Sequence, residues 1–413
     1  MRGNRTYPNS VLSRILTVLL KVVFALILLA VLSVLGTGLS PIYDFRPPEP
    51  FSGPDIFNPY ASLDTAAGWK RANFHTHTRV KTLFPPNECE AWPEETYAAY
   101  EKLGYDIVTF SNHNALTVHP FDSTLQVNVY EQGYSPFKFH KLVFGSDHVR
   151  HLDPLLPLLA SQKQFELDCL GKGSDFIQMN HPYRTIGTSL RHMQALSGYE
   201  IMELDSHFST ENEYWDWALS AGHYSFGLAS DDLHHAWRTE CIAMRCSFLQ
   251  TPSARYEDLK ETLLGGCYYS MRIPDYGQGD WDYKYEMNRH LPSVRTIGLD
   301  GSTVYMTLSQ TADSIRVNGQ DHRTLALALQ CDSIAYTMAP EDPYVRLTAF
   351  FPDGAVIYTN PFARYDASVA SGPMNNAPQR VNVLLTVLYN LLLLVLGAGT
   401  LYLLVILFKR RKR

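Results

Sequence analysis

The sequence predicts an α/β protein, with a domain of parallel strands and helices, then a small antiparallel β domain, flanked by two transmembrane helices. From Trp69 onward, strand-like and helix-like runs alternate at spacings of about 25 to 50 residues, which is typical of parallel β/α architecture. After about Leu291 the runs become short and alternating, and the turn signals Asn318-Gly319 and Asp353-Gly354 separate them. Long apolar runs lie near both ends of the chain.

The first apolar run, Ile15 to Leu39, contains one charge, Lys21, and is long enough to cross a hydrocarbon core of about 30 Å. Arg2, Arg5 and Arg14 precede it, so a cleaved signal peptide is the alternative to an anchor. The run is long for a signal peptide and no A-x-A site follows it. We therefore expect a signal anchor.

The second apolar run is Val381 to Phe408, and the basic cluster Lys409 to Arg413 follows it directly. Positive charge on the outer side of both runs predicts that both termini are cytoplasmic. The residues between the runs then lie across the membrane. We expect a two-pass protein of a bacterial inner membrane, with its central domain in the periplasm or at the cell exterior.

The elements of the central region follow from local patterns. Arg71 to Phe74 reads as a short strand, and Pro93 to Leu103 reads as a helix that begins with Pro and Glu and stops at Gly104. Tyr105 to Ser111 is a buried strand. Further along, the expected elements are strands at Asp175–Met179, Tyr199–Leu204 and Ser225–Ala229, and a helix at Tyr214–Ser220.

These elements divide the chain into consecutive segments. By residue number they are a cytoplasmic N-terminus (1–14), a transmembrane helix (15–39), a Pro-rich linker (40–68), the β/α domain (69–290), a β-sandwich-like domain (291–368), a linker (369–380), a transmembrane helix (381–408) and a basic cytoplasmic tail (409–413).

The composition narrows the function classes. The chain has 413 residues, with 35 Lys+Arg against 41 Asp+Glu and a net charge of −6, so we expect no binding of nucleic acid. Hydrophobic residues make up 46%, which excludes a disordered chain. The six cysteines show no C-x-x-C spacing, and both disulfides and free thiols stay open.

Polar clusters follow several predicted strands. They are His75-Thr76-His77, Asn112-His113-Asn114, Asn180-His181-Pro182 and Ser230-Asp231-Asp232-Leu233-His234. The carboxyl ends of parallel strands converge on one face, where active sites are built. His75 and His77 are two residues apart on an extended segment, so both point the same way and can share one metal. Imidazole and carboxylate together suit Zn²⁺, Mn²⁺ or Fe.

This ordered set of motifs resembles the PHP (polymerase and histidinol phosphatase) superfamily over about Arg71 to Pro274. The matching elements are the H-x-H motif at His75 and His77, the strand Gly104 to Asn114 with His113, a bridging Glu at Glu131, then His140, the His-Pro pair His181-Pro182, and the D-x-H motif at Asp232 and His234. The resemblance implies a distorted TIM-type (β/α)7 barrel.

The resemblance also implies two or three divalent ions (Zn, Mn or Fe) held at strand ends. The implied metal ligands are His75, His77, His113, Glu131, His140, His181, Asp232 and His234. Arg184 is placed to hold phosphate, with a surface or salt-bridged Arg as the alternative interpretation. Glu203 ends a predicted strand and would orient a ligand histidine.

Some positions depart from the family pattern or stay open. Asn112 stands where Asp is usual, and no aligned ligand follows His77. Asp231 is an alternative to Asp232, although the D-x-H spacing favours Asp232. Asp205 and His207 are weaker ligand candidates.

We expect a membrane-anchored metal-dependent phosphoesterase that hydrolyses a phosphate ester outside the cytoplasm by a metal-activated water. The alternatives are a non-catalytic binding or sensor module with at most a structural metal, and an amidohydrolase-type C–N hydrolase. The expected partners are a small-molecule or envelope-associated phosphate ester and the lipid bilayer. The sequence indicates no oligomeric state.

Overall fold

The computed structural model describes residues 11–81, 87, 89–133, 139–184, 188–206, 209–210, 212–274, 279–373 and 379–409. Most of the two predicted cytoplasmic ends, residues 1–10 and 410–413, lies outside the described residues, and so does the ligand candidate His207.

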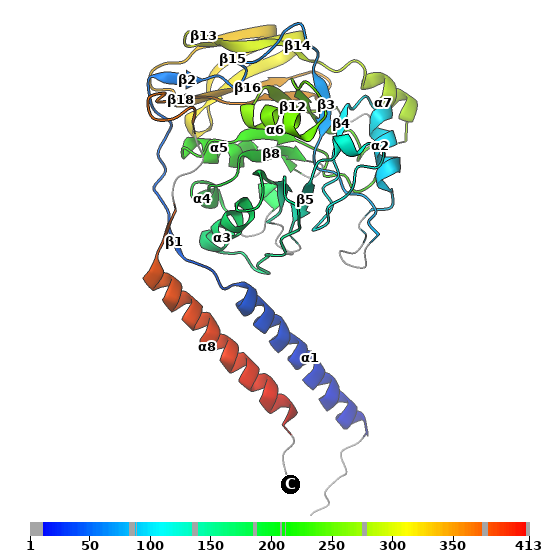
Figure 1. The fold of residues 1–413 in the computed structure, drawn as a ribbon, viewed down its shortest axis with the longest axis vertical. Coiled ribbons are helices and arrows are strands. Elements are labelled where there is room, and N and C mark those ends of the chain that lie inside the picture. Colours follow the sequence, from blue (N-terminus) through cyan, green and yellow to red (C-terminus); the bar gives the residue numbers. More distant parts are fainter. Residues whose placement is uncertain are drawn as a thin grey trace, which may run out of the picture.

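Two long apolar helices lie at the ends of the chain, α1 (Val11–Thr37) and α8 (Val383–Phe408). By length and composition both can cross a membrane, and most of their side chains are exposed. They contact each other and extend from one side of the rest of the protein (Figure 1). Where they join it, β1 (Tyr43–Asp44) pairs antiparallel with β19 (Arg380–Val381), so both helices are held at one place.

The first sheet has six strands in the order β10-β8-β7-β6-β5, with β9 paired to β8. Its strands are β5 (Val129–Gln132), β6 (Lys141–Phe144), β7 (Phe176–Met179), β8 (Ile201–Ser206), β9 (Ser209–Thr210) and β10 (Phe226–Ala229). The pairs β7–β8 and β8–β10 are parallel, whereas β5–β6, β6–β7 and β8–β9 are antiparallel.

The second sheet has eleven strands and the main order β13-β14-β16-β17-β12-β11-β3-β4. On this path lie β3 (Lys70–Asn73), β4 (Ile107–Val108), β11 (Arg245–Leu249), β12 (Tyr268–Arg272), β13 (Val294–Asp300), β14 (Thr303–Gly319), β16 (Tyr344–Phe350) and β17 (Val356–Thr359). Off the path, β15 (Arg323–Thr337) pairs with β14, and β18 (Phe362–Tyr365) pairs with β16 and with β2 (Asp55–Phe57).

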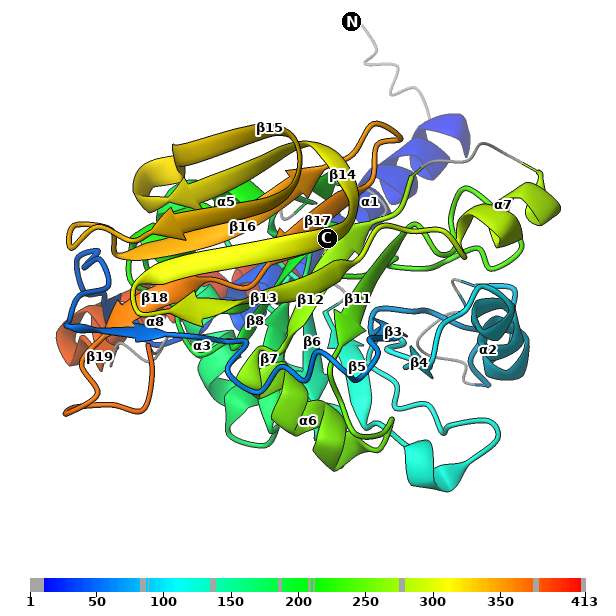
Figure 2. The same cartoon turned by 90° about the horizontal axis from the view of Figure 1, so that it is seen from above.

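Strands β13 to β18 pair with one another antiparallel, as the turn signals predict. Their sheet does not stop at the predicted boundary between 290 and 291, because β17 pairs with β12 from Tyr269↔Thr359 to Arg272↔Val356. Seen from the end opposite the helices, β13 to β16 lie over the rest of the protein (Figure 2).

Each sheet is open and mixed, so the strand order by itself does not show the distorted (β/α)7 barrel that the resemblance implies. The pair β5–β6 is antiparallel, because the few residues between Gln132 and Lys141 are fewer than the crossover that a parallel pair needs. Two isolated parallel bridges, Thr76↔Leu233 and His113↔Glu131, link the β3–β4 edge of one sheet to the other sheet. The ends of β3, β4, β5 and β10 therefore lie together.

The helices of the central region are short. They are α2 (Pro93–Lys102), α3 (Ala160–Gly171), α4 (Leu190–Met193), α5 (Asn212–Ser220), α6 (Tyr256–Gly265) and α7 (Trp281–Met287), with 3₁₀ turns η1 (Ser123–Leu125), η2 (Pro182–Arg184) and η3 (Gln320–His322). The start of α2 at Pro93 confirms the predicted helix, and Gly104 follows its end with φ +79°, a value that favours glycine.

Two clusters of buried apolar side chains form the core. Each contains residues from both sides of the predicted domain boundary; Tyr344 and Tyr358, for example, pack in the same cluster as Phe74 and Phe144. None of the six cysteines forms a disulfide in this structure.

Candidate metal centre

The candidate ligands stand where buried strands end. Most of these strands are apolar and buried in the core, and most of the ligands stand where the chain leaves the sheet. His75 and His77 follow β3, His113 follows β4, Glu131 lies in β5, His140 precedes β6, His181 follows β7, Glu203 lies in β8, and Asp232 and His234 follow β10. The structure therefore brings all eight predicted metal ligands, and Glu203, to one place.

Glu131 is at the centre of the cluster. Its Oε1 lies 3.2–3.3 Å from three imidazole nitrogens, namely His75 Nε2, His140 Nδ1 and His181 Nε2. Its Oε2 lies 3.2 Å from His77 Nε2 and 3.0 Å from His113 Nε2. Oε2 is buried and makes no hydrogen bond among the described residues. A buried carboxylate oxygen surrounded by imidazole nitrogens in this way is typical of a metal ligand set.

Asp232 forms the other acidic corner of the cluster. Its Oδ1 lies 3.3 Å from His75 Nε2 and 3.2 Å from His77 Nε2. Its Oδ2 accepts a hydrogen bond from Arg184 Nη1 at 2.7 Å. His234 lies farther out, with Nδ1 3.6 Å from Asp232 Oδ1 and its ring 4.5 Å from that of His77.

These side chains form two groups whose ligand atoms all lie within 4.8 Å of one another. The first group is His75, His77, Glu131 and Asp232, and the second is His113, Glu131 and His140. Glu131 belongs to both, so one carboxylate can bridge two ions. Neutral imidazole and carboxylate are the ligands that Zn²⁺, Mn²⁺ and Fe²⁺ accept, so the side chains fit such ions.

Glu203 lies behind the ligands rather than among them. Its Oε1 is 2.8 Å from His75 Nδ1, and its Oε2 accepts the backbone N–H of His181 at 2.9 Å. The carboxylate thereby fixes the His75 ring so that Nε2 points at Glu131 and Asp232. Glu203 is the residue for which the sequence predicts an orienting carboxylate, and that role stays a prediction.

Arg184 is a cation bonded directly to the cluster, through Asp232. Its side chain is 20% exposed, so the guanidinium stands at the boundary between the buried ligands and solvent. Both readings of the sequence describe part of this position, since Arg184 pairs with an acidic group and also borders the candidate site.

The electrostatics of the cluster favour charged carboxylates. Burial opposes the ionised form of Glu131 and of Asp232, but the surrounding imidazoles outweigh it and hold both pKa values well below their usual range. Burial also opposes a charged His77, yet Asp232 and Glu131 raise its pKa to about 9. Burial lowers the pKa of His140 to about 3, so that ring is neutral and ready to coordinate.

Three residues of the cluster loops have positive φ although they are not glycine. They are Asn114 (φ +45°), His181 (φ +24°) and Asp232 (φ +50°). Such conformations cost about 1–3 kcal/mol each and persist where surrounding contacts impose them. At Asp232 the turn separates the directions of two adjacent acids. Asp231 accepts N–H groups from Ala243 and from Met244, while Asp232 faces the imidazoles.

Other candidates have structural roles. Asn112 Oδ1 accepts the N–H of Thr78 at 2.7 Å, and its amide donates to Thr117 Oγ1, so it braces the loop that carries His113. Asp205 accepts bonds from Arg245 Nε and Tyr358 Oη at 2.9 Å each, which keeps it away from the ligand set.

The sequence reasoning assigned no role to Asn180, whose Nδ2 donates to Glu131 Oε1 at 2.8 Å. This amide helps to hold the central carboxylate in place. Its position directly before the His181-Pro182 pair was a signal that could have identified it.

No family model matches the chain, and no curated protein matches it. Among solved structures, one similar chain is a two-domain protein containing a predicted PHP-like metal-dependent phosphoesterase from Bacteroides vulgatus ATCC 8482. It has 13% identity and a TM-score of 0.36, and the match covers 77% of this chain and 100% of that one. Another is the lesion-specific endonuclease EndoQ from Pyrococcus furiosus, with 12% identity, a TM-score of 0.32 and coverage of 48% and 56%. Both similarities are too distant to assign an activity to this chain.

Proposed function

We propose that this protein is a metal-dependent phosphoesterase. The observation that carries the proposal is the shared carboxylate, because Glu131 belongs to two adjacent ligand groups. A structural zinc site is closed by four ligands and needs no bridge to a second group. A bridged pair of ions is instead typical of enzymes that displace an alkoxide from phosphorus.

Each side chain has a role in this proposal. Bound divalent ions would neutralise charge on the phosphate and lower the pKa of a bound water. His75, His77 and Asp232 would hold one ion and His113 and His140 the other, with Glu131 shared. His181 and His234 flank these groups and would complete the two or three sites for Zn, Mn or Fe.

Arg184 would bind a phosphate oxygen of the substrate. Its guanidinium already meets one anionic oxygen, on Asp232, and it is partly exposed where the ligands are buried. A planar guanidinium suits bidentate contact with phosphate, which places the ester next to the ligand set. Glu203 would act through His75, by keeping the ring in one orientation.

We also propose that the catalytic region is a distorted PHP-type (β/α)7 barrel. The ordered motifs and their arrival at one place support this. The two isolated bridges support it too, because they join β3, β4, β5, β6, β7, β8 and β10 into a ring of neighbours.

The proposed location is a bacterial inner membrane, with α1 and α8 spanning it and the central region in the periplasm or at the exterior. Hydropathy and helix length support two spans, and the basic flanks support this topology. Protease added to intact spheroplasts should digest the central region and leave both tails. Protection of the central region would overturn the topology, and a mature chain starting near residue 40 would overturn the anchor.

The function is tested with the full chain purified in detergent micelles. We expect two or three equivalents of a divalent metal by mass spectrometry, and hydrolysis of 4-nitrophenyl phosphate that a chelator abolishes and Mn²⁺ or Zn²⁺ restores. Retained metal without hydrolysis of any phosphate ester would instead support a non-catalytic module.

A further inference from the structure

The end of α1 is bonded to the segment that leads into α3. Leu155 N donates to Thr37 Oγ1 at 3.2 Å, and Gln162 Nε2 donates to Gly38 O at 3.3 Å. The same amide lies 3.2 Å from the hydroxyl of Tyr389 in α8. Residues 155–162 therefore mark the level at which both apolar helices meet the rest of the protein.

Residues next to the candidate metal ligands are bonded to this part of the chain. A short turn joins α3 to β7, so helix and strand run in opposite directions and the first turn of α3 lies near the end of β7, which leads to His181. Lys141, next to His140, bonds Glu166 of α3 at 2.6 Å. Gln132, next to Glu131, donates to Leu152 O.

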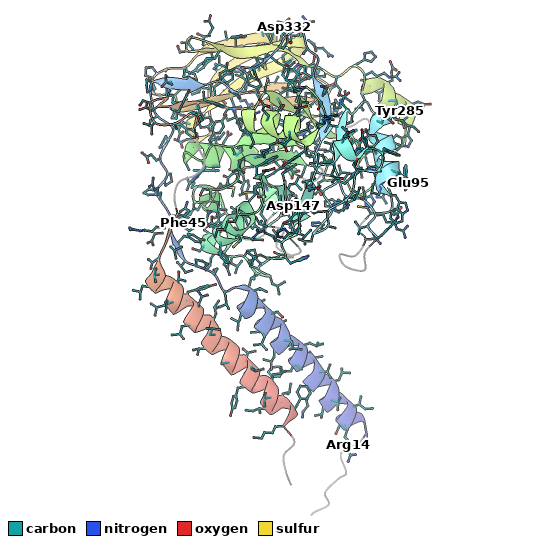
Figure 3. The ribbon with its side chains drawn as sticks, in the orientation of Figure 1. Arg14, Phe45, Glu95, Asp147, Tyr285 and Asp332 are labelled. Carbon is teal, nitrogen blue, oxygen red and sulfur yellow. The ribbon has the colours of Figure 1, made fainter. Side chains whose placement is uncertain are left out.

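Two short routes thus connect the ligands with the end of α1. One runs from Glu131 through Gln132 and Leu152 to Leu155, and the other passes from His140 into α3. In Figure 1, α3 and β5 lie on the side that faces α1 and α8, and β13 to β15 lie at the opposite end. Figure 3 shows the same orientation, with Asp332 and Arg14 at opposite ends of the molecule.

Exposed apolar side chains lie beside the end of α1, and others follow two of the ligands in the sequence. Leu158 and Leu159, beside the end of α1, are 47% and 42% exposed. Tyr183, two residues after His181, is 65% exposed, and Trp237, three residues after His234, is 51% exposed. A chain spans at most about 3.6 Å per residue, so the Cα atoms of Tyr183 and Trp237 lie close to those of the ligands that precede them. Tyr and Trp are the side chains that favour the interface between bilayer and water.

We infer that the substrate is a phosphate monoester carried by a membrane lipid and hydrolysed at the bilayer surface. This inference rests on the proposed function, and it adds the substrate class. Leu158, Leu159, Tyr183 and Trp237 would contact the lipid surface, and the headgroup would reach the ligands and Arg184. Water would form a bond to phosphorus, the P–O bond to the lipid would break, and the lipid alcohol would take a proton.

The first test compares substrates with the full chain in lipid nanodiscs. The probes are a diacylglycerol 3-phosphate, a polyprenyl phosphate and soluble glycerol 3-phosphate at equal total concentration. We expect at least a tenfold higher rate with one bilayer-borne ester, and the two lipids distinguish a glycerolipid from an isoprenoid source. Equal or faster turnover of the soluble ester would overturn the lipid inference and leave the phosphoesterase proposal intact.

A second test needs no activity. All six tryptophans lie outside α1 and α8, so nanodiscs made with brominated lipids quench only those that touch the bilayer. We expect quenching in the parent chain and loss of at least half of it in Trp237→Phe, but not in Trp281→Phe. If no ester is hydrolysed, the proposed function fails, and this measurement still decides the membrane contact. Equal quenching in Trp237→Phe and the parent would overturn the inference.

A variant links the two tests. Tyr183→Ser combined with Trp237→Ser should lower the ratio of lipid to soluble turnover at least tenfold. The matched control is Tyr283→Ser with Tyr305→Ser, which removes two exposed aromatic rings from α7 and β14. The control should keep the ratio of the parent. An unchanged ratio in the Tyr183 and Trp237 variant would contradict the inference.

Discussion

Glu131 and Asp216 are both buried carboxylates with a lowered pKa, but their partners differ. Asp216 in α5 receives the fork of Arg346 in β16, with Nε and Nη2 at 2.7 and 2.5 Å. A guanidinium is always charged and has no free electron pair with which to bind a metal. The ion pair of Asp216 and Arg346 can therefore only stabilise the structure. The imidazoles around Glu131 can be neutral and coordinate. The residue that contacts the carboxylate, rather than the carboxylate itself, therefore distinguishes a structural ion pair from a set of metal ligands.

The strongest way to test this comparison is to remove two imidazoles. His75→Ala combined with His77→Ala should abolish metal bound to the first group and lower phosphatase activity more than ~100-fold, beyond the range expected for an outer partner. The fold should survive, because the ligands lie beyond the strands that form the apolar core. Metal analysis, activity and circular dichroism check these results. His223→Ala combined with His290→Ala is the matched control, and parental activity in the first variant would refute the site.

Breaking the ion pair of Asp216 and Arg346 should have the opposite effect, a loss of stability without a loss of bound metal. Arg346→Ala leaves Asp216 buried without its fork, and breaking such a pair costs about 3–5 kcal/mol. Urea denaturation in micelles should record this loss, while the folded fraction keeps the metal content of the parent. Arg316→Ala, at an exposed position of β14, should change stability by less than about 0.5 kcal/mol. Loss of metal from folded Arg346→Ala would remove the distinction between the two carboxylates.

Glu166 is a third buried carboxylate, and it should differ from the other two in how it makes stability depend on pH. Burial raises its pKa to about 7, although Lys141 at 2.6 Å opposes this. The folded state then holds the proton more tightly than the unfolded state, whose pKa is near 4.5. The stabilisation of the folded state by this proton is complete below pH 4.5 and is lost as the pH rises through 7. The free energy of unfolding should therefore fall by up to ~3 kcal/mol across that range.

Glu166→Gln should flatten that part of the stability profile, since the amide cannot titrate. Asp175→Asn is the control, because burial opposes the ionised form of Asp175 but Lys260 and Tyr256 together outweigh it and lower its pKa. Its contribution appears above pH 3.8 and is lost on acidification, so that variant should leave the window near pH 7 unchanged. Unfolding midpoints measured from pH 4 to 8 decide between the profiles, and an unaltered slope in Glu166→Gln would contradict the assignment.

The smallest expected effect concerns the carboxylate behind the ligands. Glu203→Gln keeps a hydrogen-bonding group beside His75 Nδ1 but removes the charge that orients the ring. We expect metal affinity to fall about 10–100-fold with the fold intact. Titration of the metal-free chain with Zn²⁺ measures the change, and Gln164→Leu, in α3, tests whether loss of another buried polar group has the same effect. Equal losses in both variants would show that Glu203 is no more than a packing residue.

Strand ends and local motifs could be predicted from the sequence because they depend on neighbouring residues. The polar residues that follow the predicted strands indicated that His75, His181 and Asp232 belong to one candidate site. The spacing of D-x-H favoured Asp232 over Asp231, but the reason lies in the backbone. The positive φ at Asp232 points one acid at the imidazoles and leaves the other in a hydrogen-bonded turn. No periodicity in the sequence reports such a turn.

Long-range pairing could not be predicted in the same way. A buried strand such as β6 has the same apolar pattern whether its neighbours run parallel or antiparallel. Likewise, β12 and β17 are compatible with separate sheets, and only their edges decide that they join. Asn180 escaped notice because an amide has no fixed partner until the fold brings Glu131 within reach.

The contacts between the two ends of the central region set the order in which the chain can fold during synthesis. Asn360 N donates to Tyr60 Oη across 300 residues, and β18 pairs with β2 beside it. Ser40 N reaches Asn390 in α8 across 350 residues. Strands β1 and β2 therefore have no strand partner until β19 and β18 have left the ribosome. Until then their open edges need protection, so the protein should depend on chaperones for as long as its last segment is being translated.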